Sequence, residues 1–181
     1  MTRTLLVALT MLADALAGAA AAHPHNYVDQ QVQLSLGLGG AQVTVRIVPS
    51  AEDGPAIFAH VDADGDGAVY EGEAQVFADA VAAGLSLKVD GQAVALGTAT
   101  ASMAPAGEVQ AGTGGLSVTA TAPLALAAGA SHVVAFEVSF EAFAHEWFVQ
   151  PFYRPDLVEA FGTPALARSD DGSQVTIKLG S

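Results

Sequence analysis

Four acidic residues in one short segment have the types and spacing that could bind a metal ion. Asp62, Asp64 and Asp66 alternate with small residues, and Glu73 follows seven positions after the last of them. Carboxylate oxygens are the ligands that hard cations prefer, and calcium takes about six to eight oxygens. Because carboxylates this close together repel one another unless a cation lies between them, the segment is predicted to bind Ca²⁺.

The segment from Asp62 to Glu73 resembles the twelve-residue calcium-binding loop of the EF-hand. The resemblance implies side-chain ligands at the first, third, fifth and twelfth positions of the loop. These positions hold Asp62, Asp64, Asp66 and Glu73 here, and the last would bind calcium through both carboxylate oxygens.

Three other positions of the loop also agree with the EF-hand pattern. Gly67 stands sixth, where the chain turns sharply with a positive φ. Ala68 stands seventh, where the backbone carbonyl is the ligand, and Tyr70 stands ninth, where the contact usually passes through a water. The alternative interpretation is a solvated Asp/Gly turn, and Mg²⁺ is the competing ion.

The sequence contains one such loop, whereas EF-hands usually occur in pairs. The segment Asp170-Asp171-Gly172 is too short to be a second. We therefore expect either that the loop packs on the rest of the protein or that two molecules pair. An isolated loop favours a weak, structural calcium site over a sensor.

Five histidines form a second set of candidate ligands. His23 and His25 stand two apart near the predicted mature N-terminus, where they could bind a transition metal, with His132 or His145 completing the site. The amide chelate typical of a third-position histidine is blocked, because Pro24 has no N–H. The other interpretation is a solvated tail.

No pattern of residues indicates catalysis. No nucleophile elbow surrounds any serine, and His145-Glu146-Trp147 lacks the second histidine of a zinc-protease helix. The sequence therefore favours a protein that is not an enzyme.

Composition excludes several classes of partner. The 181 residues include 19 Asp and Glu against 6 Lys and Arg, which gives a net charge of −13. This balance argues against nucleic acid and against anionic membrane surfaces, which both need clustered basic residues. The absence of cysteine excludes disulfides and thiolate metal sites.

Residues 1–22 have the features of a secretory signal peptide. Arg3 supplies the positive charge, an apolar stretch follows, and Ala20 and Ala22 have the spacing of a cleavage site near Ala22. We therefore expect a periplasmic or secreted protein with no stable insertion in the membrane.

The elements that position these candidate ligands are predicted to be mostly strands. Apolar residues alternate over residues 28–36, 43–47, 85–89, 94–96, 116–120, 132–140, 147–152 and 174–179, with an Asp90-Gly91 turn between the third and fourth. Helices are predicted over 51–59 and 74–83, the second with Val76, Phe77, Ala80 and Val81 on its apolar face. Residues 97–115 are predicted to be a loop.

These elements predict a mainly β fold, an antiparallel, immunoglobulin-like sandwich, in one domain over residues 23–181. An EF-hand-like helix–loop–helix is inserted at residues 50–84.

A wider resemblance rests on Ala22-His23-Pro24-His25, on residues 62–73 and on the Leu87–Gly91 hairpin. In this order they resemble an uncharacterised family of bacterial periplasmic proteins that begin Ala-His-Pro-His. The order is also similar to the extracytoplasmic N-terminal domain of nickel/cobalt exporter-like proteins. The resemblance implies an alternative function, a periplasmic accessory protein that binds nickel, cobalt, copper or zinc and acts beside a membrane metal transporter.

Overall fold

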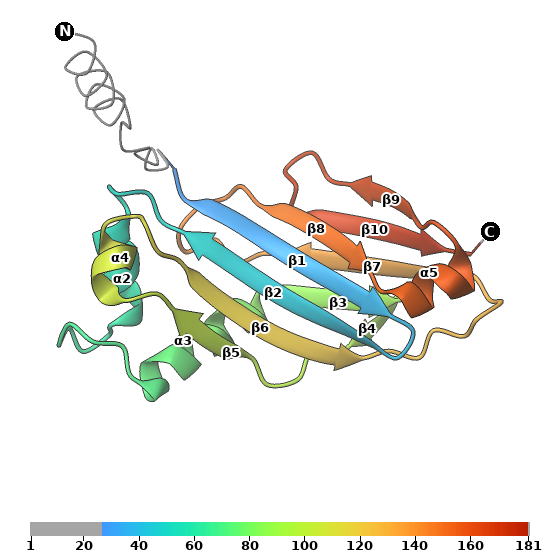
Figure 1. Cartoon of the computed structure of the whole chain (residues 1–181), viewed down its shortest axis with the longest axis horizontal. Coiled ribbons are helices and arrows are strands. Elements are labelled where there is room, and N and C mark those ends of the chain that lie inside the picture. The colour runs from blue at the N-terminus through green and yellow to red at the C-terminus, as the bar shows by residue number, and fades with distance from the viewer. Residues whose placement is uncertain (1–26, 181) are drawn as a thin grey trace, which may run out of the picture.

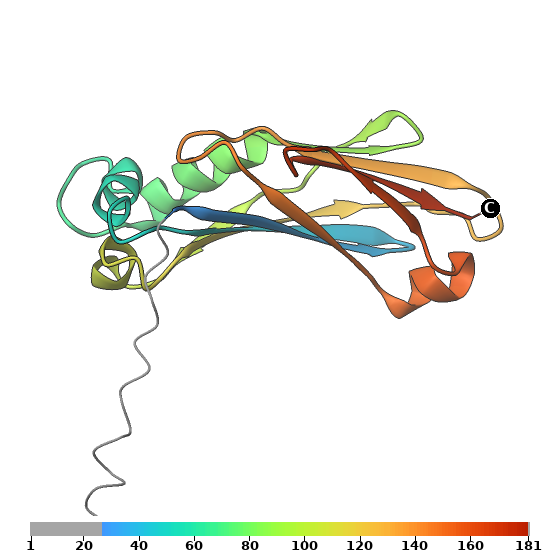
Figure 2. The same cartoon turned by 90° about the horizontal axis from the view of Figure 1, so that it is seen from above.

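The computed structural model describes residues 27–180, which form two five-stranded β-sheets (Figure 1). Figure 2 shows the two sheets as layers, with the helices gathered at the ends. The prediction of a mainly β sandwich is confirmed at this level. The predicted signal peptide, His23 and His25 lie outside the described residues.

The first sheet has the strand order β5-β6-β2-β1-β8. Its strands are β1 (Asp29–Gly37), β2 (Gly40–Val48), β5 (Thr100–Met103), β6 (Leu116–Pro123) and β8 (Phe148–Tyr153). β1 and β2 form the expected hairpin, but β8 runs parallel to β1. The antiparallel prediction is therefore wrong for this pair, because β8 arrives from the second sheet by a crossing connection and not by a hairpin.

The second sheet has the strand order β4-β3-β7-β10-β9. Its strands are β3 (Leu85–Val89), β4 (Gln92–Val94), β7 (His132–Val138), β9 (Ala165–Arg168) and β10 (Gln174–Leu179). The predicted Asp90-Gly91 turn joins β3 to β4, with both residues at positive φ (51° and 80°). This is the backbone that a two-residue hairpin favours.

The core lies between the sheets and comes from the alternating positions. β1 contributes Val32, Leu34 and Leu36, and β7 contributes Val134 and Phe136, all of them buried. Burying such a side chain stabilises the fold by roughly 1.5–3 kcal/mol.

Two helices stand between β2 and β3 in the chain, at one end of the sandwich (Figure 1). They are α2 (Gly54–Val61) and α3 (Glu71–Ala83), against predicted ranges of 51–59 and 74–83. α2 begins later than predicted because Pro55 fits only the first turn of a helix. The residues just before it form a turn in which Ser50 Oγ accepts a hydrogen bond from Asp53 N at 3.0 Å.

The predicted apolar face of α3 is partly wrong. Phe77 and Val81 are buried as expected, but Ala78 is the third buried residue. Val76 is 70% exposed, and Ala80 is also exposed. The buried face is rotated because α3 packs beside β5, which the sequence did not predict.

Two short elements occupy the predicted loop at 97–115, namely β5 and α4 (Ala106–Gln110). α5 (Pro155–Phe161) and β9 were likewise not predicted. With five residues, α4 is too short to leave an apolar period in the sequence, and β9 leaves none because all four of its residues are exposed.

Candidate metal centre

The acidic loop, residues 62–73, begins directly after α2, and its last three residues form the start of α3. Asp62 is the C-cap of α2, and its N–H donates to Phe58 O at 2.9 Å. At the other end α3 begins at Glu71, so Glu73 lies in its first turn. Both ends of the loop are therefore held by helices that pack on different neighbours, α2 on α4 and α3 on β5.

Three carboxylates of this loop converge. Asp62, Asp64 and Asp66 each offer a carboxylate oxygen, and these oxygens all lie within 4.8 Å of one another. They are the only such group of acidic or histidine side chains in the part of the chain that the structure describes. Asp62 is only 7% exposed, whereas the other two face solvent. Hard oxygen donors at this separation suit calcium or magnesium.

Backbone N–H groups orient the three carboxylates. Asp62 accepts hydrogen bonds from Gly65 N at 3.1 Å and from Gly67 N at 2.9 Å. Asp64 Oδ1 accepts from Asp66 N at 3.1 Å, and Asp66 Oδ1 accepts from Ala68 N at 2.9 Å. No described residue donates to the second oxygen of Asp64 or of Asp66, so both oxygens can face a cation.

Glu73 lies next to this group but not within it. Its Oε1 accepts from Ala63 N at 2.8 Å and from Asp64 N at 3.3 Å, and its Oε2 accepts from Tyr70 N at 3.0 Å. The carboxylate therefore closes the loop by joining its second and third residues to the start of α3. To act as a bidentate ligand, it must exchange some of these contacts for the cation.

The two other predicted positions of the site are Ala68 and Tyr70. The N–H of Ala68 is used by Asp66, which leaves its carbonyl as the group that could bind a metal. The side chain of Tyr70 is exposed.

The three described histidines do not meet. His60 packs its ring edge-on against Phe143 at 5.0 Å, and the exposed His145 lies 3.5 Å from Glu141. His132 stands at the start of β7. These separate positions give no transition-metal site among the described histidines.

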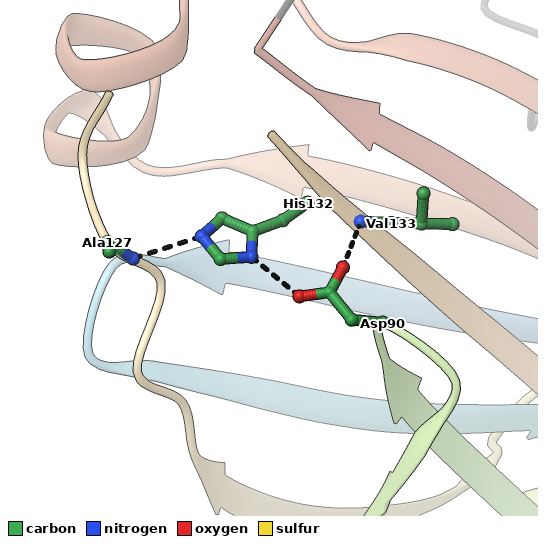
Figure 3. Close-up of polar contacts among 4 residues, drawn as sticks. All are labelled: Asp90, Ala127, His132 and Val133. Carbon is green, nitrogen blue, oxygen red and sulfur yellow. Dashed lines mark hydrogen bonds and ion pairs between the residues drawn. The ribbon is translucent and has the colours of Figure 1, made fainter. Parts of the chain in front are cut away.

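Both ring nitrogens of His132 already have partners (Figure 3). Nδ1 lies 2.7 Å from Asp90 Oδ2, and Ala127 N donates to Nε2 at 3.1 Å. Since Nε2 accepts a hydrogen bond, the proton of the neutral ring sits on Nδ1 and is donated to Asp90. Neither nitrogen is free to bind a metal, which argues against the expected contribution of His132.

The contact between His132 and Asp90 was missed by the sequence analysis. Asp90 Oδ1 also accepts from Val133 N at 2.8 Å, and the hydrogen bond from His132, followed by that from Val133, lowers the pKa of Asp90. The Asp90-Gly91 turn was the one signal in the sequence that pointed to this contact, because the turn fixes the end of β3 beside the strand that carries His132. The pairing of β3 with β7 could not be read from the sequence.

None of the helices in the described part of the chain has the length and apolar character needed to cross a membrane.

Comparison with known proteins adds no relative. No family model, no curated protein and no solved structure matches the chain.

Proposed function

We propose that the protein binds calcium through an EF-hand loop formed by residues 62–73. The observation that carries this proposal is the convergence of the Asp62, Asp64 and Asp66 carboxylates to within 4.8 Å. The start of α3 at Glu71 also supports it, because Glu73 then lies in the first helical turn, next to the carboxylate group.

Each predicted ligand of the loop has a role in this proposal. Asp62, Asp64 and Asp66 supply one side-chain oxygen each, and Glu73 supplies two. Ala68 contributes its backbone carbonyl, and Tyr70 acts through a water. Calcium offsets the repulsion among the carboxylates and joins α2 to α3, so its role is structural.

A matched pair of variants tests the proposal. Glu73→Gln removes one charge and the bidentate ligand, and we expect it to weaken calcium affinity by about tenfold or more. Glu71→Gln removes the same charge two residues away, at a position that is not a ligand, and should change affinity by less than about threefold. Titration calorimetry measures the calcium affinity of both variants. If the dissociation constants lie near a millimolar, the amide shifts of Gly65 and Gly67 measure them instead.

Two results would contradict calcium binding at this loop. One is the absence of saturable calcium binding in the wild-type protein. The other is an equal loss of affinity in the two variants, which would indicate a general charge effect. A magnesium titration identifies the preferred ion.

We further propose that the protein is exported and is not an enzyme. The charged, apolar and small-residue regions of residues 1–22 support export. N-terminal mass analysis of the protein from its native compartment tests this: a chain beginning at His23 is expected, and a chain that keeps Met1 or Thr2 contradicts it.

We also propose an immunoglobulin-like topology for the sandwich. The orders β5-β6-β2-β1 and β4-β3-β7-β10 support it, because they match the D-E-B-A and C′-C-F-G orders of such domains. In that topology the helix–loop–helix is an insertion between the B and C strands, and β8, α5 and β9 form a second insertion between F and G.

A further inference from the structure

A pocket of about 450 Å³ lies between the helix–loop–helix and the edge of the first sheet. Its apolar walls come from Phe58 of α2, Phe77 of α3, Met103 of β5 and Leu116 of β6. The loop contributes Val69, which lies between the proposed calcium ligands Ala68 and Tyr70. A space of this size and lining suits a few apolar side chains.

One wall of the pocket is the edge strand β5, whose only strand partner among the described residues is β6. Beyond the end of this pair, Ala104 N donates to Gly115 O at 3.0 Å. Because hydrogen-bonding groups alternate along an antiparallel strand, those of Met103 and Ala101 point away from β6, towards the edge that no other described strand covers.

Next to these two residues, a side chain of α3 forms a hydrogen bond with the backbone of the same edge. Gln75 Nε2 of α3 donates to the outward carbonyl of Ala99 at 3.1 Å. No described residue makes the equivalent contact with the backbone of Ala101 or Met103, and both residues line the pocket. The sheet edge therefore presents free donors and acceptors beside an apolar space.

The charge around the pocket has one sign. Among the residues that the structure describes, Glu71 is the only charged one in its lining, and no Lys or Arg contributes to that lining. The whole chain carries a net charge of −13. A second copy of the chain would bring the same charge to the interface, so a basic partner is favoured over self-association.

We propose that an extended segment of a partner protein, with apolar residues alternating with Lys or Arg, binds here by adding a strand to β5. Its backbone pairs with Ala101 and Met103, its apolar side chains enter the pocket, and a basic side chain lies beside Glu71. Main-chain hydrogen bonds supply affinity in this mode of recognition, and alternate side chains supply specificity.

In the first test, model peptides are titrated into the full-length protein. Acetyl-Lys-Val-Lys-Val-Lys-amide should bind and shift the amide resonances of Ala101, Met103 and Val69. The Glu-Val-Glu-Val-Glu analogue should bind at least about tenfold more weakly, because its charges repel Glu71. Absence of binding up to a millimolar, or shifts confined to another surface, overturns the proposal.

The second test separates backbone pairing from filling of the pocket. Ala101→Pro removes the outward N–H, which β6 does not use and whose loss an edge strand tolerates. Ala101→Val adds similar volume but keeps the N–H. The loss of one hydrogen bond predicts about two- to tenfold weaker binding for the proline variant relative to the valine variant. Equal binding of the two variants contradicts strand addition.

Two controls distinguish this site from its alternatives. Ala101→Pro should leave calcium affinity within about twofold, because Ala101 lies in β5 and not in the loop, so failure of calcium binding and failure of peptide binding are separable. Sedimentation velocity of the free protein should show a monomer. A dimer that Ala101→Pro dissociates would instead identify a second copy as the occupant.

Discussion

At Asp90, one carboxylate holds the start of β7 against the β3–β4 turn. It accepts hydrogen bonds from the ring of His132 and from Val133 N, and its pKa is lowered by them in that order. The same histidine ring accepts a hydrogen bond from Ala127 and meets Phe161 edge-on at 5.9 Å. Asp90 and His132 together thus connect the start of β7 with the β3–β4 turn, with the segment before β7 and with α5.

The lowered pKa of Asp90 predicts a loss of stability in acid. A carboxylate with a folded pKa below its unfolded value stabilises the fold above the unfolded pKa, which is about 3.9. This contribution is lost as the pH falls below that value and through the folded pKa. Asp90→Asn should therefore be less stable than wild type at pH 6, with the difference shrinking below about pH 4.

Urea unfolding at pH 6, 4 and 3 measures this change. Glu52→Gln, at an exposed position before α2, serves as the control and should show little pH-dependent difference from wild type. A difference between Asp90→Asn and wild type that stays constant over this range would contradict the assignment.

Among the loop residues, Gly67 has a positive φ of 89°, and a Cβ there would meet no atom within 4 Å. Gly72 is equally open but lies in α3. Gly67→Ala should lower the free energy of unfolding by about 1 kcal/mol through backbone strain alone. Gly72→Ala should raise it by about 0.5 kcal/mol, because alanine favours a helix.

Urea denaturation of the two alanine variants compares these opposite signs. If Gly67→Ala were as stable as Gly72→Ala, the left-handed turn at the centre of the loop would not exist in solution.

At the scale of elements, the strands with strong alternation were predicted well. Residues 28–36 and 174–179 correspond closely to β1 and β10, because their alternate side chains enter one core. The helix face was less well predicted. Its burial depends on β5, and no local pattern reveals how a distant edge strand lies beside α3.

The acidic loop was predictable for a different reason. Its carboxylates lie within five residues of one another, so local turns alone bring them together. Pairs such as His132 with Asp90 are set by sheet order, which the sequence does not show. The same applies to the pocket beside β5, whose walls come from the acidic loop and from five separate helices and strands.

At the scale of the whole molecule, a buried glutamine of β1 fastens the connection that leads into β8. Gln30 Nε2 donates to Ala144 O at 2.9 Å and to Glu146 O at 3.1 Å. Nearby, Trp147 Nε1 donates to Phe140 O at 3.0 Å within the same connection. These contacts direct β8 from the second sheet to its parallel place beside β1.

Replacing this glutamine should therefore weaken the whole fold. Gln30→Leu keeps the volume but removes both hydrogen bonds, which should cost about 1 kcal/mol. Gln42→Leu, at an exposed position of β2, should change stability by less than about 0.5 kcal/mol. Fluorescence of the single tryptophan follows both unfolding curves, and equal stability of the two variants would refute the role of Gln30.

The parallel pairing of β1 with β8 also affects the order of folding. Gln30 and Ala144 are 114 residues apart, so β1 gains its second neighbour only after most of the chain has been synthesised. Contacts of such long range require the closure of large loops and slow the folding of β proteins. Until then the β1–β2 hairpin has one unpaired edge, and a chain shortened before β8 should accumulate as an incompletely folded species that is prone to aggregate.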